Sequence, residues 1–181
     1  VNTIYKKNNK IIGANTDIKG FSFALKHIKY KVKGKKIFIL GAGGVTPSII
    51  FALKQMEAST IMLTNRTKEK AESLKKQFPF LELIKWGDTK RFDMIINATS
   101  LGLKENDKLP LNYDQIGKGK FFYDVIYNPK KTNFLLQAEK LGNQIENGKI
   151  MFAYQAQEAF KLWHGSLPPI NKEALEMLEN D

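Results

Sequence analysis

The chain has 181 residues, of which 43% are apolar, 26% charged and 11% aromatic, a composition typical of one globular domain with appendages. It contains no cysteine, and its two histidines, His27 and His164, lie far apart in the sequence, so we expect neither a disulfide framework nor a metal site. The net charge is +11, but no nucleic-acid-binding motif or set of stacking aromatics accompanies the scattered lysines. We therefore expect a solvated basic surface and no nucleic-acid partner.

No apolar run approaches the roughly 18 residues that a membrane span needs, so we expect no membrane association. The sequence opens at Val1 on a strand pattern without a signal peptide ahead of it. The expectation is a start inside a longer chain and, by default, a cytoplasmic location.

Residues 1–14 predict a hairpin in which Asn8 and Asn9 form the turn, and a helix is expected to begin near Lys19. From Lys36 onward, short apolar runs alternate with helical patterns, which is typical of parallel strands joined by crossover helices. Predicted strands cover residues 36–40, 60–64, 81–85, 92–97, 121–125 and 144–147. Predicted helices cover residues 45–56, 68–77, 132–141, 151–163 and 172–178, and a polar loop surrounds Pro110.

This order of elements predicts an α/β fold with a Rossmann-like, doubly wound parallel sheet flanked by helices. The opening hairpin is expected to belong to a different sheet. We expect three parts: the end of another domain with a connecting helix over residues 1–30, a dinucleotide-binding domain over 31–149, and C-terminal helices over 150–181 that pack back toward the first part. On the first of these C-terminal helices, Ala156, Phe160 and Trp163 have the spacing of a core-facing stripe.

A glycine-rich turn, Gly41-Ala42-Gly43-Gly44, stands between the first parallel strand and a helix with Pro47 near its start. In this setting backbone N–H groups can reach a pyrophosphate at the positive end of the helix. The match is partial, because Thr46 stands where the strict motif has its third glycine, and an ordinary tight turn is the alternative.

The second parallel strand ends at Thr64 and leads into Asn65-Arg66-Thr67, with Lys70 close behind. NAD-binding enzymes have an acidic residue here that accepts a hydrogen bond from the ribose 2′-hydroxyl, and this chain has none. A guanidinium suits a 2′-phosphate, so we expect NADP rather than NAD. The alternative is a solvated basic helix start. The fourth strand ends at Asn97-Ala98-Thr99-Ser100, where small residues permit a close ligand approach, although they could simply cap a loop.

Taken together, these segments resemble the shikimate dehydrogenase family over essentially the whole chain. The matching stretches, in the order of the family, are Val1-Asn2-Thr3, Asn15-Thr16-Asp17 with Gly20, Gly41-Ala42-Gly43-Gly44, Asn65-Arg66-Thr67, Asn97-Ala98-Thr99-Ser100-Leu101-Gly102, Asp124-Val125-Ile126-Tyr127-Asn128-Pro129 with Thr132, and Gly148 to Gly165 through Met151, Gln155, Phe160 and Trp163.

The resemblance implies an oxidoreductase of aromatic amino acid biosynthesis that transfers a hydride between NADPH and the C3 carbonyl of 3-dehydroshikimate to give shikimate. It implies that Asp17 is catalytic, as the partner of a lysine, and that Asn2, Asp17, Tyr127 and Gln155 bind the substrate. An N-cap is the alternative role for Asp17. The implied cofactor-binding residues are Gly41, Ala42, Gly43, Gly44, Val45, Asn65, Arg66, Thr67, Lys70, Thr99, Ser100, Val125, Gly148 and Met151, with no metal ligand.

The family's catalytic lysine and its serine-rich loop belong to segments that lie before Val1. The resemblance therefore implies that residues 1–30 end a substrate-binding domain, and that this chain by itself binds NADP but turns over dehydroshikimate negligibly. The chain also has Val45 where Ala is usual, Lys70 where Arg is common, and Leu103 where Met is frequent. A quinate or quinate/shikimate dehydrogenase, or a purely nucleotide-binding or regulatory module, stays open, as does a monomer or a homodimer.

Overall fold

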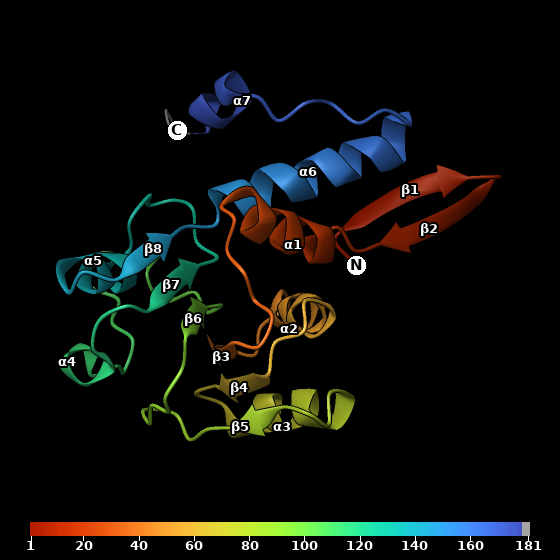
Figure 1. Cartoon of the computed structure of the whole chain (residues 1–181). Coiled ribbons are helices and arrows are strands. Elements are labelled where there is room, and N and C mark those ends of the chain that lie inside the picture. The colour runs from red at the N-terminus through yellow and green to blue at the C-terminus, as the bar shows by residue number, and fades with distance from the viewer. Residues whose placement is uncertain (179–181) are drawn as a thin grey trace. The chain divides into compact units, whose positions relative to one another are not determined.

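The computed structural model describes residues 1–178 and divides into two compact units (Figure 1). One unit combines Val1–Lys31 with the chain from Lys149 onward, and the other is Val32–Gly148. The roles that we attached to the predicted parts stay predictions, and residues 179–181 of the last part lie outside the described residues. Among residues 1–178, no helix has the length and apolar character that crossing a membrane requires.

The unit Val32–Gly148 is built on a six-stranded parallel sheet in the order β5-β4-β3-β6-β7-β8. The strands are β3 (Lys36–Leu40), β4 (Thr60–Thr64), β5 (Glu82–Leu83), β6 (Met94–Asn97), β7 (Phe121–Asp124) and β8 (Gln144–Glu146). The chain moves outward from β3 to β5, then returns to the middle and moves the other way from β6 to β8. This is the Rossmann order, and its ligand position is the crevice between the carboxyl ends of β3 and β6.

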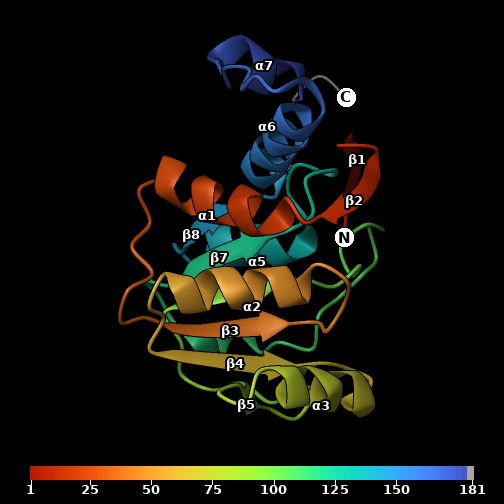
Figure 2. The ribbon, with the colours of Figure 1, turned by 90° about the vertical axis from the view of Figure 1, so that its right-hand side faces the viewer.

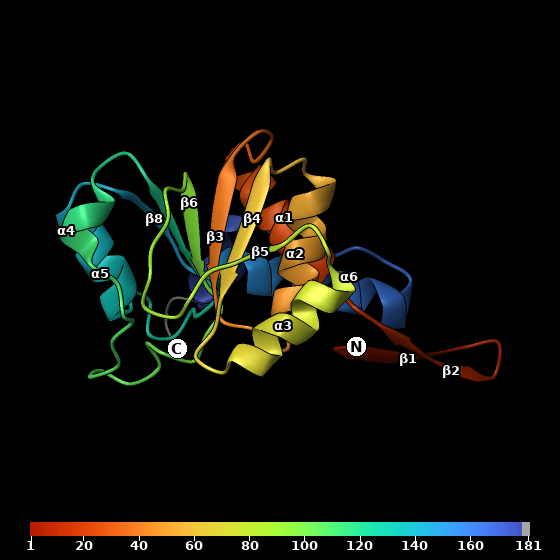
Figure 3. The same cartoon turned by 90° about the horizontal axis from the view of Figure 1, so that it is seen from below.

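Helices cover both faces of this sheet, as Figures 1 and 3 show. Helices α2 (Thr46–Gln55) and α3 (Lys68–Gln77) lie on one face, and α5 (Asn133–Lys140) lies on the other with the short α4 (Tyr113–Ile116). In Figure 2, α2 runs alongside β3 and α3 alongside β5. The doubly wound α/β fold predicted from the sequence is confirmed.

The core of this unit explains why its strands read as continuous apolar runs. On one face, Phe38 and Leu40 of β3 belong to a buried cluster with Phe134 and Leu135 of α5. Ile37 and Ile39, whose side chains point to the opposite face of the sheet, are buried as well. The strand is therefore covered on both faces and shows no alternation of apolar and polar residues. Each such side chain contributes roughly 1.5 to 3 kcal/mol through its burial.

Within residues 1–178, the other unit contains a separate hairpin and three helices. The hairpin pairs β1 (Thr3–Lys7) with β2 (Lys10–Ala14), and its helices are α1 (Asp17–His27), α6 (Lys149–His164) and α7 (Lys172–Met177). The hairpin turn uses Asn8 and Asn9 at φ 49° and 56°, a left-handed conformation that asparagine tolerates better than most residues. Both the turn and the separate sheet agree with the prediction.

Helices α1 and α6 pack closely through a glycine. A Cβ on Gly20 would lie 2.9 Å from both the Cβ of Gln155 and the carbonyl oxygen of Met151, so only glycine allows this approach. Lys19 of α1 adds an ion pair at 2.7 Å to the buried carboxylate of Glu158 on α6.

The prediction of a core-facing stripe on α6 is wrong. The stripe of Ala156, Phe160 and Trp163 does not face a core: Phe160 is 38% and Trp163 56% exposed, and Ala156 is exposed too. Apolar residues form more than one stripe on α6, and contact with Gly20 selects the one that contains Met151. The spacing alone does not tell which stripe is buried.

The structure also begins α1 at Asp17 rather than near Lys19, so the alternative role of Asp17 as an N-cap is wrong. The N-cap position is Thr16, and the side chain of Asn15 accepts a weak hydrogen bond from the Ile18 N–H at 3.3 Å. In the loop around Pro110, the sequence missed α4, a single turn capped by Asn112, because one turn is too short for a periodic pattern.

Candidate functional site

The glycine-rich turn after β3 is fixed to the neighbouring strand ends. The Gly41 N–H donates to the carbonyl oxygen of Thr64 at 2.8 Å, and the Ala42 N–H donates to the side-chain oxygen of Asn65 at 2.9 Å. Gly41 takes φ 105°, and a Cβ there would lie 2.8 Å from the carbonyl oxygen of Ala98. Glycine is therefore required at this position by both conformation and space.

Thr46 supports the same turn from inside, at the position where the strict motif has glycine. Its hydroxyl accepts from the Gly43 N–H at 3.1 Å and donates to the Gly41 carbonyl at 2.9 Å. Within residues 1–178, this leaves the N–H groups of Gly44 and Val45 as the members of the turn without a hydrogen bond. Both stand at the N-terminus of α2, where the partial positive charge of a helix favours an anion.

Cationic side chains gather where β4 ends. Arg66 and Lys70 are exposed, and neither forms a hydrogen bond or an ion pair within the described part of the chain. Asn65 braces this segment, since its side-chain nitrogen donates to the carbonyl of Thr67 at 2.7 Å while its oxygen holds the glycine turn. The amide thus has a structural contact at each end, and its predicted role in cofactor binding stays a prediction.

The glycine turn and the basic segment share one hollow with the loop after β6. Its volume is about 400 Å³, and its lining consists of Gly41, Ala42, Gly43, Asn65, Arg66, Thr67, Lys70, Trp86, Ala98, Thr99, Ser100 and Leu101. The structure therefore brings together most of the residues that the sequence predicts for the cofactor. Trp86 is an addition that the sequence reasoning missed, because no motif marks it. Leu101 belongs to a stretch that matches the family but was not assigned to the cofactor.

A buried polar network lies behind this hollow, where β6 and β7 end. Asn97 and Asp124 are fully buried, and the Asn97 side-chain nitrogen donates to both Asp124 carboxylate oxygens at 3.1 and 3.2 Å. Asp124 also accepts from the hydroxyl of Thr132 at 2.6 Å and from the N–H of Ile126 at 3.0 Å. Burial raises the pKa of Asp124 to about 6, although these hydrogen bonds oppose the shift.

The same network shapes the loop that lines the hollow. The side-chain oxygen of Asn97 accepts from the N–H and the hydroxyl of Thr99 at 3.1 and 2.7 Å, and its nitrogen also donates to the Leu101 carbonyl at 2.9 Å. The Thr99 hydroxyl accepts in turn from the Leu101 N–H at 3.0 Å. The hydroxyl of Ser100 forms no hydrogen bond within residues 1–178 and lines the hollow. The loop is therefore rigid at Thr99 and open to a ligand at Ser100.

Val125 and Gly148 meet after β7 and β8. A Cβ on Gly148 would lie 2.1 Å from the Val125 carbonyl oxygen, which excludes any other residue without backbone movement, and the Gly148 N–H donates to the Ile126 carbonyl at 3.1 Å. Tyr127 follows in the same loop with 44% of its surface exposed.

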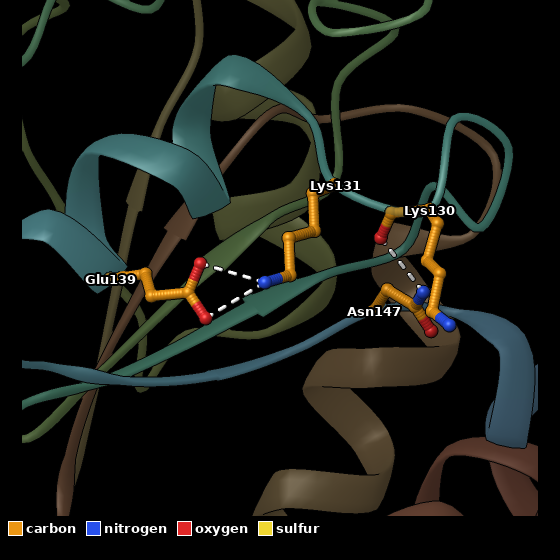
Figure 4. A network of polar contacts seen from close by, with 4 residues as sticks. All are labelled: Lys130, Lys131, Glu139 and Asn147. Carbon is orange, nitrogen blue, oxygen red and sulfur yellow. Dashed lines mark hydrogen bonds and ion pairs between the residues drawn. The ribbon is translucent and has the colours of Figure 1, made fainter.

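Figure 4 shows how the end of this loop is tied down. Lys131 forms a two-pronged ion pair with Glu139 of α5 at 2.8 and 2.7 Å, and the Asn147 side chain donates to the Lys130 carbonyl at 2.9 Å. The loop that carries Tyr127 is thus fastened on both sides.

In the other unit, Asn2 and Asp17 are in direct contact. The Asn2 side-chain nitrogen donates to an Asp17 carboxylate oxygen at 2.7 Å and to the Thr16 hydroxyl at 3.0 Å, while its oxygen accepts from the Thr16 N–H at 2.9 Å. Burial raises the pKa of Asp17, an effect that the bond from Asn2 partly offsets. Gln155 and Met151 lie on the face of α6 that contacts Gly20 of α1. Gly20 follows Asp17 by about one turn of α1.

Among the described residues, no cluster of histidine and carboxylate side chains could hold a metal ion. The Rossmann sheet, the unpaired amides at the start of α2 and the unpaired cations after β4 instead define the class of the protein: a dinucleotide-binding protein with a preference for an anionic ligand.

Comparison with known proteins gives the family. The family described as Shikimate / quinate 5-dehydrogenase matches residues 22–104. A curated shikimate dehydrogenase (NADP(+)) of Pelagibacter ubique is 58% identical over 179 residues, which cover 99% of this chain and 68% of that protein. The crystal structure of shikimate dehydrogenase from Aquifex aeolicus superposes with a TM-score of 0.87 at 38% identity, over 98% of this chain and 65% of that one.

A solved structure of another activity is also similar. The ligand-free 5-ketofructose reductase of a Gluconobacter strain has a TM-score of 0.86 at 32% identity, covering 98% of this chain and 67% of that one. The chain belongs to the shikimate dehydrogenase family, as predicted, and spans about two thirds of the length of the relatives that it matches.

Proposed function

We propose that the chain is the NADP-binding part of a shikimate dehydrogenase, which reduces 3-dehydroshikimate reversibly with NADPH. The observation that carries this proposal is the exposed Arg66, which has no hydrogen-bonding or ionic partner in residues 1–178 and shares one hollow with the glycine turn. The curated relative from Pelagibacter ubique, at 58% identity, is named for NADP(+).

The residues present fit this cofactor. The free N–H groups of Gly44 and Val45 would donate hydrogen bonds to the pyrophosphate oxygens, and Arg66 and Lys70 would hold the 2′-phosphate of the adenosine ribose. The bound cofactor supplies a hydride to the substrate carbonyl carbon. Gly148, packed on the Val125 carbonyl, leaves this part of the backbone without a side chain, which suits a flat nicotinamide ring.

We assign Asn2, Asp17, Gln155 and Tyr127 to the substrate, with Asp17 as the group that accepts from a substrate hydroxyl and takes part in proton transfer. The raised pKa of Asp17 suits such a role, because a general acid or base works best when its pKa lies nearer the working pH. A cytoplasmic location and a monomeric or homodimeric state stay predictions.

The test of the cofactor assignment is a binding measurement. Arg66→Ala should weaken NADPH binding by roughly 10 to 100-fold, since hydrogen bonds to a charged group are worth about 1.5 to 3 kcal/mol, and should leave NADH binding unchanged. Calorimetric titration of both dinucleotides measures this. Arg91→Ala is the matched control, because Arg91 is exposed and does not line the hollow. Equal losses for NADPH and NADH would remove the basis for NADP.

The test of the activity uses the chain alone and the chain joined to the part of the Pelagibacter ubique relative that it does not match. We expect NADPH binding by both and turnover by the joined protein. In the joined protein, Asp17→Asn should lower kcat by about 100-fold or more while NADPH binding stays unchanged. Near-normal turnover by the Asp17→Asn variant would exclude a catalytic role for this carboxylate.

Two neighbouring activities are outcomes of the same assay. The similarity to a 5-ketofructose reductase, at 32% identity, makes 5-ketofructose a substrate to compare, and quinate is the other. We expect shikimate to give the highest kcat/KM of the three, because the curated relatives at the highest identity are shikimate dehydrogenases. A higher kcat/KM for quinate or 5-ketofructose would reassign the substrate without changing the cofactor.

A further inference from the structure

A second hollow adjoins the one that contains the glycine turn. Its volume is about 350 Å³, and its lining consists of Asn65, Arg66, Lys68, Ala71, Leu83, Ile84, Lys85 and Trp86. Asn65, Arg66 and Trp86 also line the first hollow, so these three residues form the wall that the two share. A ligand that occupies the first hollow at Arg66 therefore has a second surface beside it.

The two hollows differ in chemistry. The first offers hydroxyl groups and cationic side chains, which suit phosphate. The second has an aliphatic and aromatic lining from Ala71, Leu83, Ile84 and Trp86, with cationic side chains from Arg66, Lys68 and Lys85. Such a surface suits a flat, uncharged ring that is attached to an anionic group, because the ring stacks on the apolar part while the anion stays among the cations.

Trp86 is held firmly at the boundary of the two hollows. It is half-buried and packs against the core cluster under the α5 face of the sheet. It stands in a turn closed by the Asp88 N–H to the Lys85 carbonyl at 3.0 Å, in which Gly87 takes φ 94°. The Ile84 N–H donates to the Leu63 carbonyl at 2.9 Å and fixes the start of this turn to β4. An indole placed in this way loses little conformational freedom when a ring stacks on it.

We propose that Trp86 is an adenine-binding residue: the purine of the dinucleotide stacks on its indole, while Arg66 holds the adjoining ribose phosphate. This assignment rests on the proposed NADP function. It adds a cofactor contact from the segment after β5, which lies outside the glycine-rich and arginine-containing motifs. The adenine end of the cofactor is then recognised by two elements, the segment after β4 for charge and the turn after β5 for shape.

The experiment uses the two tryptophans of the chain. Trp163 lies in the other unit and is 56% exposed, so Trp163→Phe leaves Trp86 as the single tryptophan without touching the hollows. Titrating this variant with adenosine 2′,5′-bisphosphate, which has the purine and both phosphates but no nicotinamide, should quench the Trp86 emission saturably. Inorganic pyrophosphate, which has no base, should bind without quenching.

Affinity gives an independent measurement. Trp86→Ala should weaken the binding of adenosine 2′,5′-bisphosphate by roughly tenfold, as expected for the loss of one base-stacking aromatic. Trp86→Phe should restore most of the lost affinity. Pyrophosphate binding should be the same in all variants. Because the quenching measurement needs no change at Trp86, it stands even where Trp86→Ala fails to fold.

The outcomes separate the two proposals. Saturable binding of the bisphosphate with unchanged Trp86 emission, or equal affinity in Trp86→Ala, would overturn the role of Trp86 and leave the NADP assignment intact. Failure of both NADPH and the bisphosphate to bind the unaltered chain would overturn both proposals.

Discussion

Two groups of polar residues stand at the carboxyl edge of the same sheet, and they differ in what their polar atoms are doing. After β4, Arg66 and Lys70 are exposed and unpaired within the described chain. After β6 and β7, Asn97 and Asp124 are fully buried, and both oxygens of the carboxylate accept hydrogen bonds. The first group can meet a ligand, whereas the second shapes the loop that meets it. Position at a ligand-binding edge therefore does not by itself make a residue a ligand contact.

The largest effect that this comparison predicts follows from removal of the buried carboxylate. Asp124→Ala leaves the Ile126 N–H, the Thr132 hydroxyl and the Asn97 amide without their acceptor, and should lower the free energy of unfolding by about 3 kcal/mol or more. Urea unfolding measures this. Asp114→Ala removes an exposed carboxylate on α4 and should cost less than about 0.5 kcal/mol. Equal losses in the two variants would contradict the contrast between the groups.

A pH dependence should follow from the raised pKa of Asp124. The pKa of the Asp124 carboxyl rises from 3.8 in the unfolded chain to about 6 in the folded chain, so between these pH values the folded chain binds the carboxyl proton more tightly. The stability that this group contributes is therefore greatest below pH 4 and falls as the pH rises through 6. The decline should be roughly 2 to 3 kcal/mol, because each pKa unit is worth about 1.4 kcal/mol.

Other carboxylates titrate over the same range, so the informative quantity is the difference in unfolding free energy between the unaltered chain and Asp124→Asn. This difference should shift in favour of the variant as the pH is raised from 4 to 7 and become constant above it. A difference that is flat across this range would mean that Asp124 keeps an ordinary pKa in the folded chain.

A smaller effect is expected at the exposed group. Lys70→Ala should weaken NADPH binding by roughly fivefold, as expected for the loss of one partly screened charge contact. Lys70→Arg should strengthen NADPH binding, because a guanidinium can donate two parallel hydrogen bonds to a phosphate. Lys76→Ala, an exposed position on the same helix that does not line the hollow, serves as the control. Tighter NADPH binding by Lys70→Ala would show that Lys70 does not face the phosphate.

The smallest effect concerns the ion pair of Lys131 and Glu139, shown in Figure 4. Both side chains are nearly half exposed, at 43% and 47%, so solvent screens the pair and Lys131→Ala should cost about 0.5 kcal/mol. The double variant with Glu139→Ala should lose no more than this in urea unfolding. A loss comparable to that of Asp124→Ala would place Lys131 among the buried supports instead.

The sequence predicted the sheet well because its signals are local. Strands β3 and β4 and helix α3 were predicted to the residue, since each is bounded by a change of composition or by a capping residue. Helix α4 was missed, because one turn shows no period. On α6 the burial of the stripe with Phe160 was wrong, because the choice between stripes depends on Gly20 in a distant helix.

The candidate site was predicted in its motif residues and missed in its supports. The glycine turn and Arg66 carry patterns that a single sequence displays. The contacts of Asn65 with the Ala42 N–H and of Asp124 with Asn97 join residues 23 and 27 positions apart, and the sequence does not display these pairings. Trp86 was missed for the same reason.

Thr46 closes the glycine turn with two hydrogen bonds that need no nucleotide. The glycine turn is therefore preorganised, and the free N–H groups of Gly44 and Val45 have a fixed geometry before a phosphate binds. Binding then requires little reorganisation of the turn, so the affinity for the phosphate is higher than that of a flexible turn with the same contacts. Thr46→Gly would restore the third glycine of the strict motif but would remove both hydrogen bonds that fix the glycine turn. The presence of threonine instead of glycine at this position therefore makes the turn more rigid.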